Sequence, residues 1–163
     1  MAESQTAQSK RSLAAIPLLA GLSPAGLRDI EQGCSWRRYE PGEPIVEYLD
    51  RSDDVFFLVE GEARVIIYSL TGKVVSFHDL SPGDMFGEYP AIDGRPRSAS
   101  VEARTSCLVA LMPAAAFLNL VQSEPAVSQA LLKQLHFSPE RLNLDIFRAR
   151  RQFGAAGFMP GAA

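Results

Sequence analysis

The segment from residue 82 to 103 (PGDMFGEYPAIDGRPRSASVEA) contains residue types and spacings that could bind a compact anion. Gly87 would let the backbone approach a ligand closely, and a helical turn near Glu88 would offer backbone amides with partial positive charge. Arg97 could reach the same point with a planar, permanently charged guanidinium. Glu88 lies nine residues before Arg97, and a carboxylate beside a phosphate site needs a hydroxyl, which a sugar supplies. A carboxylate (Glu88) for a ribose hydroxyl and a guanidinium (Arg97) for a phosphate together predict a nucleotide-binding pocket.

The elements that must position this segment are short strands. From Cys34 to about Met112, runs rich in Val, Ile, Phe and Tyr alternate with turn pairs at a spacing of about ten residues, which is typical of an antiparallel sandwich or barrel. We expect a hairpin of strands 55–59 and 63–68 around Gly61. The pattern predicts further strands at 73–80, 98–103 and 106–112.

Helices are expected on both sides of the strand region. Ser23 and Pro24 form a helix-start pair, and Gly33 would end that first helix. Pro113 and Pro125 stand where later helices can begin or bend. A last helix should carry an apolar stripe with helical spacing, at Leu142, Ile146, Ala149 and Phe153.

The domain organisation follows from these elements. We expect a flexible N-terminal segment at 1–12 and one folded domain at 13–137, on which the apolar run from Leu13 to Leu22 packs. The helix at 138–153 would be a lid or a dimer contact, and 154–163 a disordered tail.

Composition excludes several classes of protein. The 163 residues are 47% apolar and 21% charged, as in ordinary globular domains, and the net charge of −3 does not suggest a polyanion binder. Two His and two Cys are too few and too scattered for a metal centre, so we expect no metal and no catalysis. No run approaches the ~18 apolar residues of a membrane span, and we place the protein in the cytoplasm with reduced cysteines.

The motif FGE…DGRPRSAS resembles the phosphate-binding cassette of the cyclic nucleotide-binding domain family, the module of the catabolite activator protein, protein kinase A regulatory subunits and cyclic nucleotide-gated channels. The similarity extends from about Pro17 to Phe137 and includes the opening PLLAGLS and the turn glycines. It implies a mainly β fold, an eight-stranded antiparallel β-roll of the jelly-roll type, with a short N-terminal helix, a cassette helix and C-terminal helices. It also implies a regulatory domain whose ligand is cAMP or cGMP and whose C-terminal helices move on binding.

The resemblance implies specific roles for individual residues. Glu88 would bind the ribose 2′-hydroxyl, Arg97 the cyclic phosphate, and Ser98 would add a backbone amide or hydroxyl, with Gly87 beside the sugar. The expected ligand-binding residues are Gly87, Glu88, Tyr89, Pro90, Ala91, Arg97, Ser98 and Ala99.

Two positions depart from the family pattern. Tyr89 stands where a smaller aliphatic residue is common, and Pro90 stands where Ala or Gly usually gives an amide to the phosphate. Losing one neutral hydrogen bond of about 0.5–1.5 kcal/mol would weaken binding without abolishing it. Ser98 lies between the Thr that accompanies guanine and the Ala that accompanies adenine, and we favour cAMP. Candidates for capping the purine are Leu144, Phe147 and Arg148.

Other interpretations remain open from the sequence. Arg97 could form a structural ion pair with Asp93 or Glu88, and Phe56 and Phe57 are expected in the core rather than at a ligand. The chain could be the effector-binding part of a Crp/Fnr-type transcription regulator without its helix-turn-helix; the segment after residue 137 is too short for one, so we expect no nucleic acid binding from this chain alone. A cupin-like enzyme is a weaker alternative. The expected partners are a cyclic nucleotide and either a second copy or a fused or associated effector.

Overall fold

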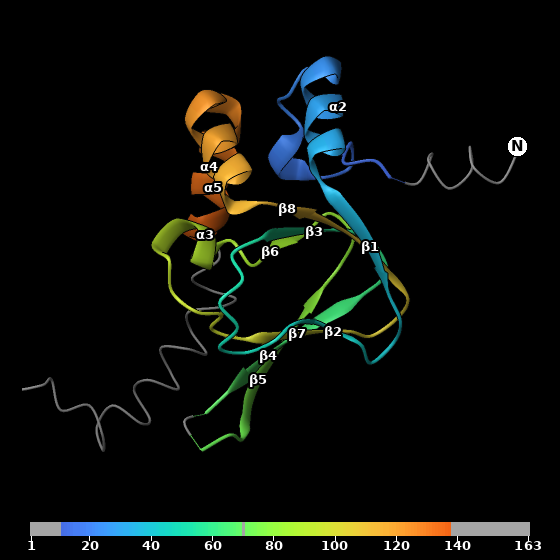
Figure 1. The fold of residues 1–163 in the computed structure, drawn as a ribbon, viewed down its shortest axis with the longest axis vertical. Coiled ribbons are helices and arrows are strands. Elements are labelled where there is room, and N and C mark those ends of the chain that lie inside the picture. The colour runs from blue at the N-terminus through green and yellow to red at the C-terminus, as the bar shows by residue number, and fades with distance from the viewer. Residues whose placement is uncertain (1–10, 70, 138–163) are drawn as a thin grey trace, which may run out of the picture.

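Two four-stranded antiparallel sheets make up the body of the protein (Figure 1). The computed structural model describes residues 11–69 and 71–137. The first sheet has the order β1-β8-β3-β6, with strands Ser35–Tyr39, Cys107–Met112, Val55–Glu60 and Met85–Phe86. The second has the order β2-β7-β4-β5, with strands Pro44–Val46, Ser100–Ala103, Ala63–Tyr68 and Val74–Leu80. The eight-stranded antiparallel roll expected from the sequence is confirmed.

Strand β3 is apolar on both faces because both of its faces are covered. Phe56 and Leu58 face the second sheet and belong to the core between the sheets, whereas Val55 and Phe57 face the helices. All four are at most 4% exposed. Strand β4, by contrast, alternates between buried and partly exposed residues, because residues 11–69 and 71–137 cover only one face of the second sheet.

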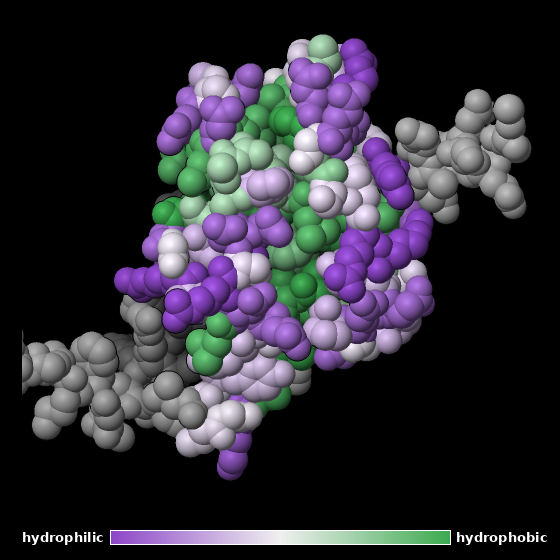
Figure 2. Space-filling model, viewed as in Figure 1, coloured by the Kyte–Doolittle hydropathy of each residue, from purple (hydrophilic) through white to green (hydrophobic). Residues whose placement is uncertain are grey.

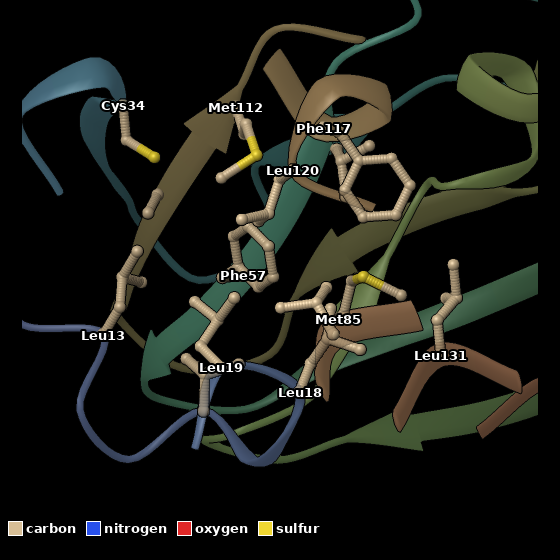
Figure 3. Close-up of a cluster of buried hydrophobic side chains, with 14 of the residues drawn as sticks. Leu13, Leu18, Leu19, Cys34, Phe57, Met85, Met112, Phe117, Leu120 and Leu131 are labelled. Carbon is tan, nitrogen blue, oxygen red and sulfur yellow. The ribbon is translucent and has the colours of Figure 1, made fainter. Parts of the chain in front are cut away.

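Helices cover the outer face of the first sheet (Figure 1). They are η1 (Pro17–Leu19), α2 (Pro24–Gly33), α4 (Ala114–Ser123) and α5 (Pro125–Phe137). Figure 3 shows Phe57 of β3 in contact with this layer, among Leu19 from the N-terminal segment and Phe117 and Leu120 from α4. On the face shown in Figure 2, apolar surface lies between α2 and the α4–α5 pair. The expected packing of the N-terminal apolar run is therefore confirmed.

The expected first helix begins where its capping residue predicts. The Ser23 hydroxyl accepts a hydrogen bond from the Gly26 amide at 3.1 Å, and Pro24 occupies the first turn of α2. Helices α4 and α5 meet at Glu124 and Pro125, as the sequence predicted.

The expected hairpin around Gly61 is wrong. Strand β3 pairs with β6 and β8, whereas β4 pairs with β5 and β7, so the chain crosses from one sheet to the other at this turn. Gly61 has φ +87°, and an added Cβ would overlap the carbonyl oxygen of Ser106. The glycine therefore marks a corner between sheets, and the real hairpin joins β4 and β5.

Several expectations lie outside the described residues. They are almost all of segment 1–12, the helix at 138–153, the tail at 154–163 and the purine-capping candidates Leu144, Phe147 and Arg148.

Candidate ligand-binding site

The chain between β6 and β7, residues 87–99, carries all the site residues expected from the sequence, and we call it the cassette. Helix α3 (Tyr89–Asp93) follows Glu88 directly and ends at Gly94, which has φ +70°. Gly87 has φ +76°, and a Cβ on it would lie 2.8 Å from Nη1 of Arg97 and 2.8 Å from the Phe56 ring. Both the conformation and the close approach require glycine at residue 87.

Arg97 is the most buried charged residue of the cassette, with 2% exposure. Its Nη1 donates to the Gly87 carbonyl at 2.7 Å, and its Nη2 donates to the Asp54 carbonyl at 2.8 Å. Nε and Nη2 both donate to the Ser52 hydroxyl at 3.3 Å. The guanidinium also lies 5.2 Å from the centre of the Phe56 ring. Every one of these acceptors is electrically neutral.

No carboxylate of the described residues forms a salt bridge with Arg97. Asp93, one of the two partners considered from the sequence, lies instead 4.0 Å from Arg95. Burial lowers the pKa of Arg97, while the charges of Asp50 and Asp54, which are not bonded to the guanidinium, oppose that shift. A buried cation without an ionic partner is costly, so this arrangement favours an incoming anion.

Glu88 is the second buried charged residue, with 6% exposure. It occupies the residue before α3, but its side chain caps no amide of that helix. Burial raises the pKa of its carboxyl, whereas the hydrogen bond that it accepts from its own backbone amide and the charge on Arg97 oppose the shift. Within residues 11–69 and 71–137 no cation lies within salt-bridge distance of this carboxylate, so it can accept a hydrogen bond from a ligand hydroxyl.

The remaining expected residues differ in what they can offer. Pro90 and Ala91 are buried, and Ala91 packs into the core cluster beneath the helices. Tyr89 is 38% exposed. Ser98 is exposed, whereas Ala99 is partly buried and packs against the core between the sheets.

Sequence reasoning missed the loop between β2 and β3. Ser52 and Asp54 supply three of the contacts to Arg97, yet they lie more than 40 residues before it in the chain. No local pattern in DRSDD links this loop to the cassette. Phe56 was correctly expected in the core, where it stacks on Phe86 at 5.1 Å, but it also supports the guanidinium.

The described part of the chain contains no group of three or more His, Cys, Asp or Glu side chains that could hold a metal ion. None of its helices is long and apolar enough to cross a membrane.

The family model of the cyclic nucleotide-binding domain matches residues 36–124, more than half of the chain and the whole cassette. The chain belongs to this family. The resemblance inferred from FGE…DGRPRSAS is confirmed, and the family is one of regulatory binding domains rather than of enzymes.

Relatives of this cyclic nucleotide-binding domain include channels and kinase subunits. A cyclic nucleotide-gated potassium channel of Mesorhizobium japonicum is 35% identical over 121 residues, 74% of this chain and 32% of the channel. A cAMP-dependent protein kinase regulatory subunit of Emericella nidulans is 32% identical over 106 residues, 65% of this chain and 25% of the subunit. The chain thus spans about a quarter to a third of these relatives.

A solved structure shares the fold. The catabolite activator protein of Thermus thermophilus superposes with a TM-score of 0.70 at 26% identity, over 80% of this chain and 61% of that protein.

Proposed function

We propose that this cyclic nucleotide-binding domain binds cAMP in preference to cGMP, with Arg97 on the cyclic phosphate and Glu88 on the ribose 2′-hydroxyl. The observation that carries the proposal is the buried Arg97 guanidinium, whose hydrogen-bond acceptors are two carbonyls and one hydroxyl. A phosphate would bring the negative charge that none of these groups supplies, and charge-assisted bonds are the strong ones.

The cassette accounts for the other half of the ligand. Glu88 precedes α3 and Gly87 holds the backbone close to Arg97, so a ribose and its phosphate can bind along one short segment. The first turn of α3 can offer the amides of Tyr89 and Ala91, because Pro90 has no N–H. We assign Ser98 and Ala99, which follow Arg97 directly, to the same site as minor contacts.

The preference for cAMP rests on two supports. Ser98 is smaller than the Thr associated with guanine in the family, and it is exposed. The relatives include a kinase regulatory subunit that is named for its dependence on cAMP.

Coupling to the C-terminal helices is the regulatory part of the proposal. Helix α3 contacts α4, and Ala91 of α3 shares a core cluster with Phe117 of α4 and Leu131 of α5. A ligand that shifts α3 would therefore also shift α4 and α5, provided that it binds one arrangement of the helices more tightly than another. We propose that these helices transmit the signal to a second copy or to a fused or associated effector.

The test is a thermodynamic cycle between Glu88 and the ribose hydroxyl. Calorimetry should show wild-type protein binding cAMP more tightly than cGMP. Glu88→Gln should weaken cAMP binding about tenfold, because a charge-assisted hydrogen bond is lost. The same substitution should change the affinity for 2′-deoxy-cAMP very little, since that ligand lacks the hydroxyl.

Glu102→Gln is the matched control, because Glu102 is an exposed carboxylate on β7. It should leave both affinities unchanged. Equal losses for the two ligands in Glu88→Gln would refute the ribose assignment, and a wild-type protein that binds neither cyclic nucleotide would refute the proposal as a whole.

A further inference from the structure

The loop between β2 and β3, residues 47–54, wraps around Arg97, and we call it the clamp loop. Its backbone both accepts a hydrogen bond from Arg97 and donates one to it. The Arg97 amide donates to the Asp50 carbonyl at 2.9 Å, and the Leu49 amide donates to the Arg97 carbonyl at 3.0 Å. These bonds replace strand pairing at this point, which explains why β7 begins at Ser100 rather than at residue 98 as expected. The loop therefore fixes the backbone from which the guanidinium extends.

Ser52 connects this loop to the guanidinium itself. Its hydroxyl donates to Oδ2 of Asp50 at 2.8 Å and accepts from Nε and Nη2 of Arg97 at 3.3 Å. A serine hydroxyl has one hydrogen, so donating it to Asp50 leaves its lone pairs for Arg97. The Asp50 carboxylate in turn lies 3.4 Å from the Ser52 amide. Asp50 therefore sets the direction in which Ser52 accepts.

The Asp50 carboxylate is suited to this role because it stays ionised. The hydrogen bond from the Ser52 hydroxyl is the largest cause that lowers the pKa of Asp50, and the charge on Arg97 acts in the same direction. An ionised carboxylate can only accept hydrogen bonds, so the Ser52 hydroxyl must act as the donor to Asp50. The lone pairs of Ser52 then remain directed to Arg97.

The contacts leave one edge of the guanidinium open. Ser52 and the Asp54 carbonyl take the hydrogens of Nε and Nη2, and the Gly87 carbonyl takes one hydrogen of Nη1. A guanidinium has five N–H donors. Among the described residues, the second hydrogen of Nη1 therefore has no acceptor.

We propose that Ser52, oriented by Asp50, is a positioning residue that fixes the plane of the Arg97 guanidinium before the ligand binds. This inference rests on the proposed function, because it assigns Arg97 to the phosphate. A guanidinium that is already aligned loses less side-chain entropy when it bonds an anion. Without the hydroxyl, Nε would bond water and the plane could rotate.

Ser52 can be changed without disturbing the core. It is exposed, and neither it nor any other residue of the clamp loop from 47 to 54 belongs to the two apolar clusters. Ser52→Ala should therefore fold like the wild type. Ser52→Thr keeps the hydroxyl, and Ser69→Ala removes a hydroxyl from the exposed turn between β4 and β5, where it bonds Thr71 and Lys73.

The experiment combines calorimetry with the NMR signal of the Arg97 Nε–H group in ligand-free protein. Ser52→Ala should weaken cAMP binding about three- to tenfold, the effect of one lost hydrogen bond, and should speed the exchange of the Arg97 Hε with water. Ser52→Thr should restore both readouts, and Ser69→Ala should change neither.

Two results would overturn the positioning role while leaving the proposed function intact. Unchanged cAMP binding by Ser52→Ala would show that the hydroxyl does not contribute to the affinity, and tighter binding would show that it competes with the phosphate for Arg97. Equal losses in Ser52→Ala and Ser52→Thr would show that the loop, not the hydroxyl, matters. Failure of the wild type to bind any cyclic nucleotide would instead overturn the proposed function and, with it, this role.

Discussion

Arg97 in the cassette and Arg64 on the outer face of the second sheet are bonded in opposite ways. Arg64 donates Nε and Nη2 to the two oxygens of Asp79, at 2.7 and 3.2 Å, and Arg104 adds a third contact to Asp79 at 3.3 Å. This cluster is solvent-exposed, and its pairing raises the pKa of Arg64. Arg97 is buried among neutral oxygens, and its pKa is lowered.

The difference separates a structural ion pair from the group to which we assign ligand binding. Arg64 has its counter-ion within the protein, so an external anion would have to displace Asp79. Arg97 is held in place by neutral acceptors, and no carboxylate of the described residues is bonded to its guanidinium. Burial alone would not make this distinction, because a buried arginine can also be paired with a carboxylate. The distinction depends on the acceptors, which are carboxylate oxygens for Arg64 and neutral carbonyl and hydroxyl oxygens for Arg97.

The largest difference in cAMP affinity is expected between the variants that remove Arg97 and Arg64. Arg97→Ala should weaken cAMP binding at least tenfold, because a charge-assisted contact worth about 1.5–3 kcal/mol is lost. Arg64→Ala should leave the affinity within twofold, since its charge is already paired and exposed. Isothermal titration calorimetry at fixed ionic strength measures both.

Arg97→Lys provides a second variant in case Arg97→Ala does not fold. Lysine keeps the charge but cannot reach Gly87, Ser52 and Asp54 together, so its affinity should also fall. Equal affinities for the Arg97 and Arg64 variants would remove the distinction between the two regions.

Glycines in the two regions provide the next test. Gly87 and Gly72 both have positive φ, at +76° and +80°, but an added Cβ would meet Arg97 and Phe56 only at Gly87. Gly72→Ala should cost about 1 kcal/mol from backbone strain alone. Gly87→Ala should cost about 1–2 kcal/mol more and should also weaken cAMP binding. Urea denaturation and calorimetry distinguish the two; similar costs would show that the cassette can relax around a Cβ.

The smallest effect is a pH dependence of opposite sign in the two regions. The pKa of Glu88 is raised by burial, so its contribution to the free energy of unfolding is greatest below the ordinary glutamate pKa and falls as pH rises through the native value. The pKa of Asp79 is lowered, chiefly by its hydrogen bond from Arg64, so its contribution is present above the ordinary aspartate pKa and is lost as pH falls.

Denaturation curves between pH 2 and 8, in steps of about one pH unit, would measure these slopes, because the Asp79 contribution changes below the ordinary aspartate pKa. Relative to wild type, Glu88→Gln should gain stability as the pH rises, and Asp79→Asn should lose it. Slopes of the same sign would mean that one of the two carboxyls is not in the environment described.

The sequence predicted the parts of the site that depend on short stretches of chain. The glycine, helical turn, acid and arginine of the cassette lie within a dozen residues, so local turn and helix preferences are enough to bring them together. The clamp loop could not be predicted, because its contact with Arg97 depends on how β2, β3 and β7 are placed in two sheets. The mistaken hairpin has a similar cause, since a glycine turn between apolar strands looks the same whether the strands pair or separate into two sheets.

Under the proposed function, the charges around Arg97 would also discriminate between kinds of phosphate. Asp50, Asp53, Asp54 and Glu88 all act on this single guanidinium. A cyclic phosphodiester carries one negative charge, which one guanidinium neutralises, whereas an open monoester carries about −1.5 to −2 at pH 7. The extra charge of a monoester would meet the repulsion of these four carboxylates. Under the proposed function, such a site would hold the hydrolysed monoester more weakly than the cyclic nucleotide, so hydrolysis of the ring would also favour release of the ligand.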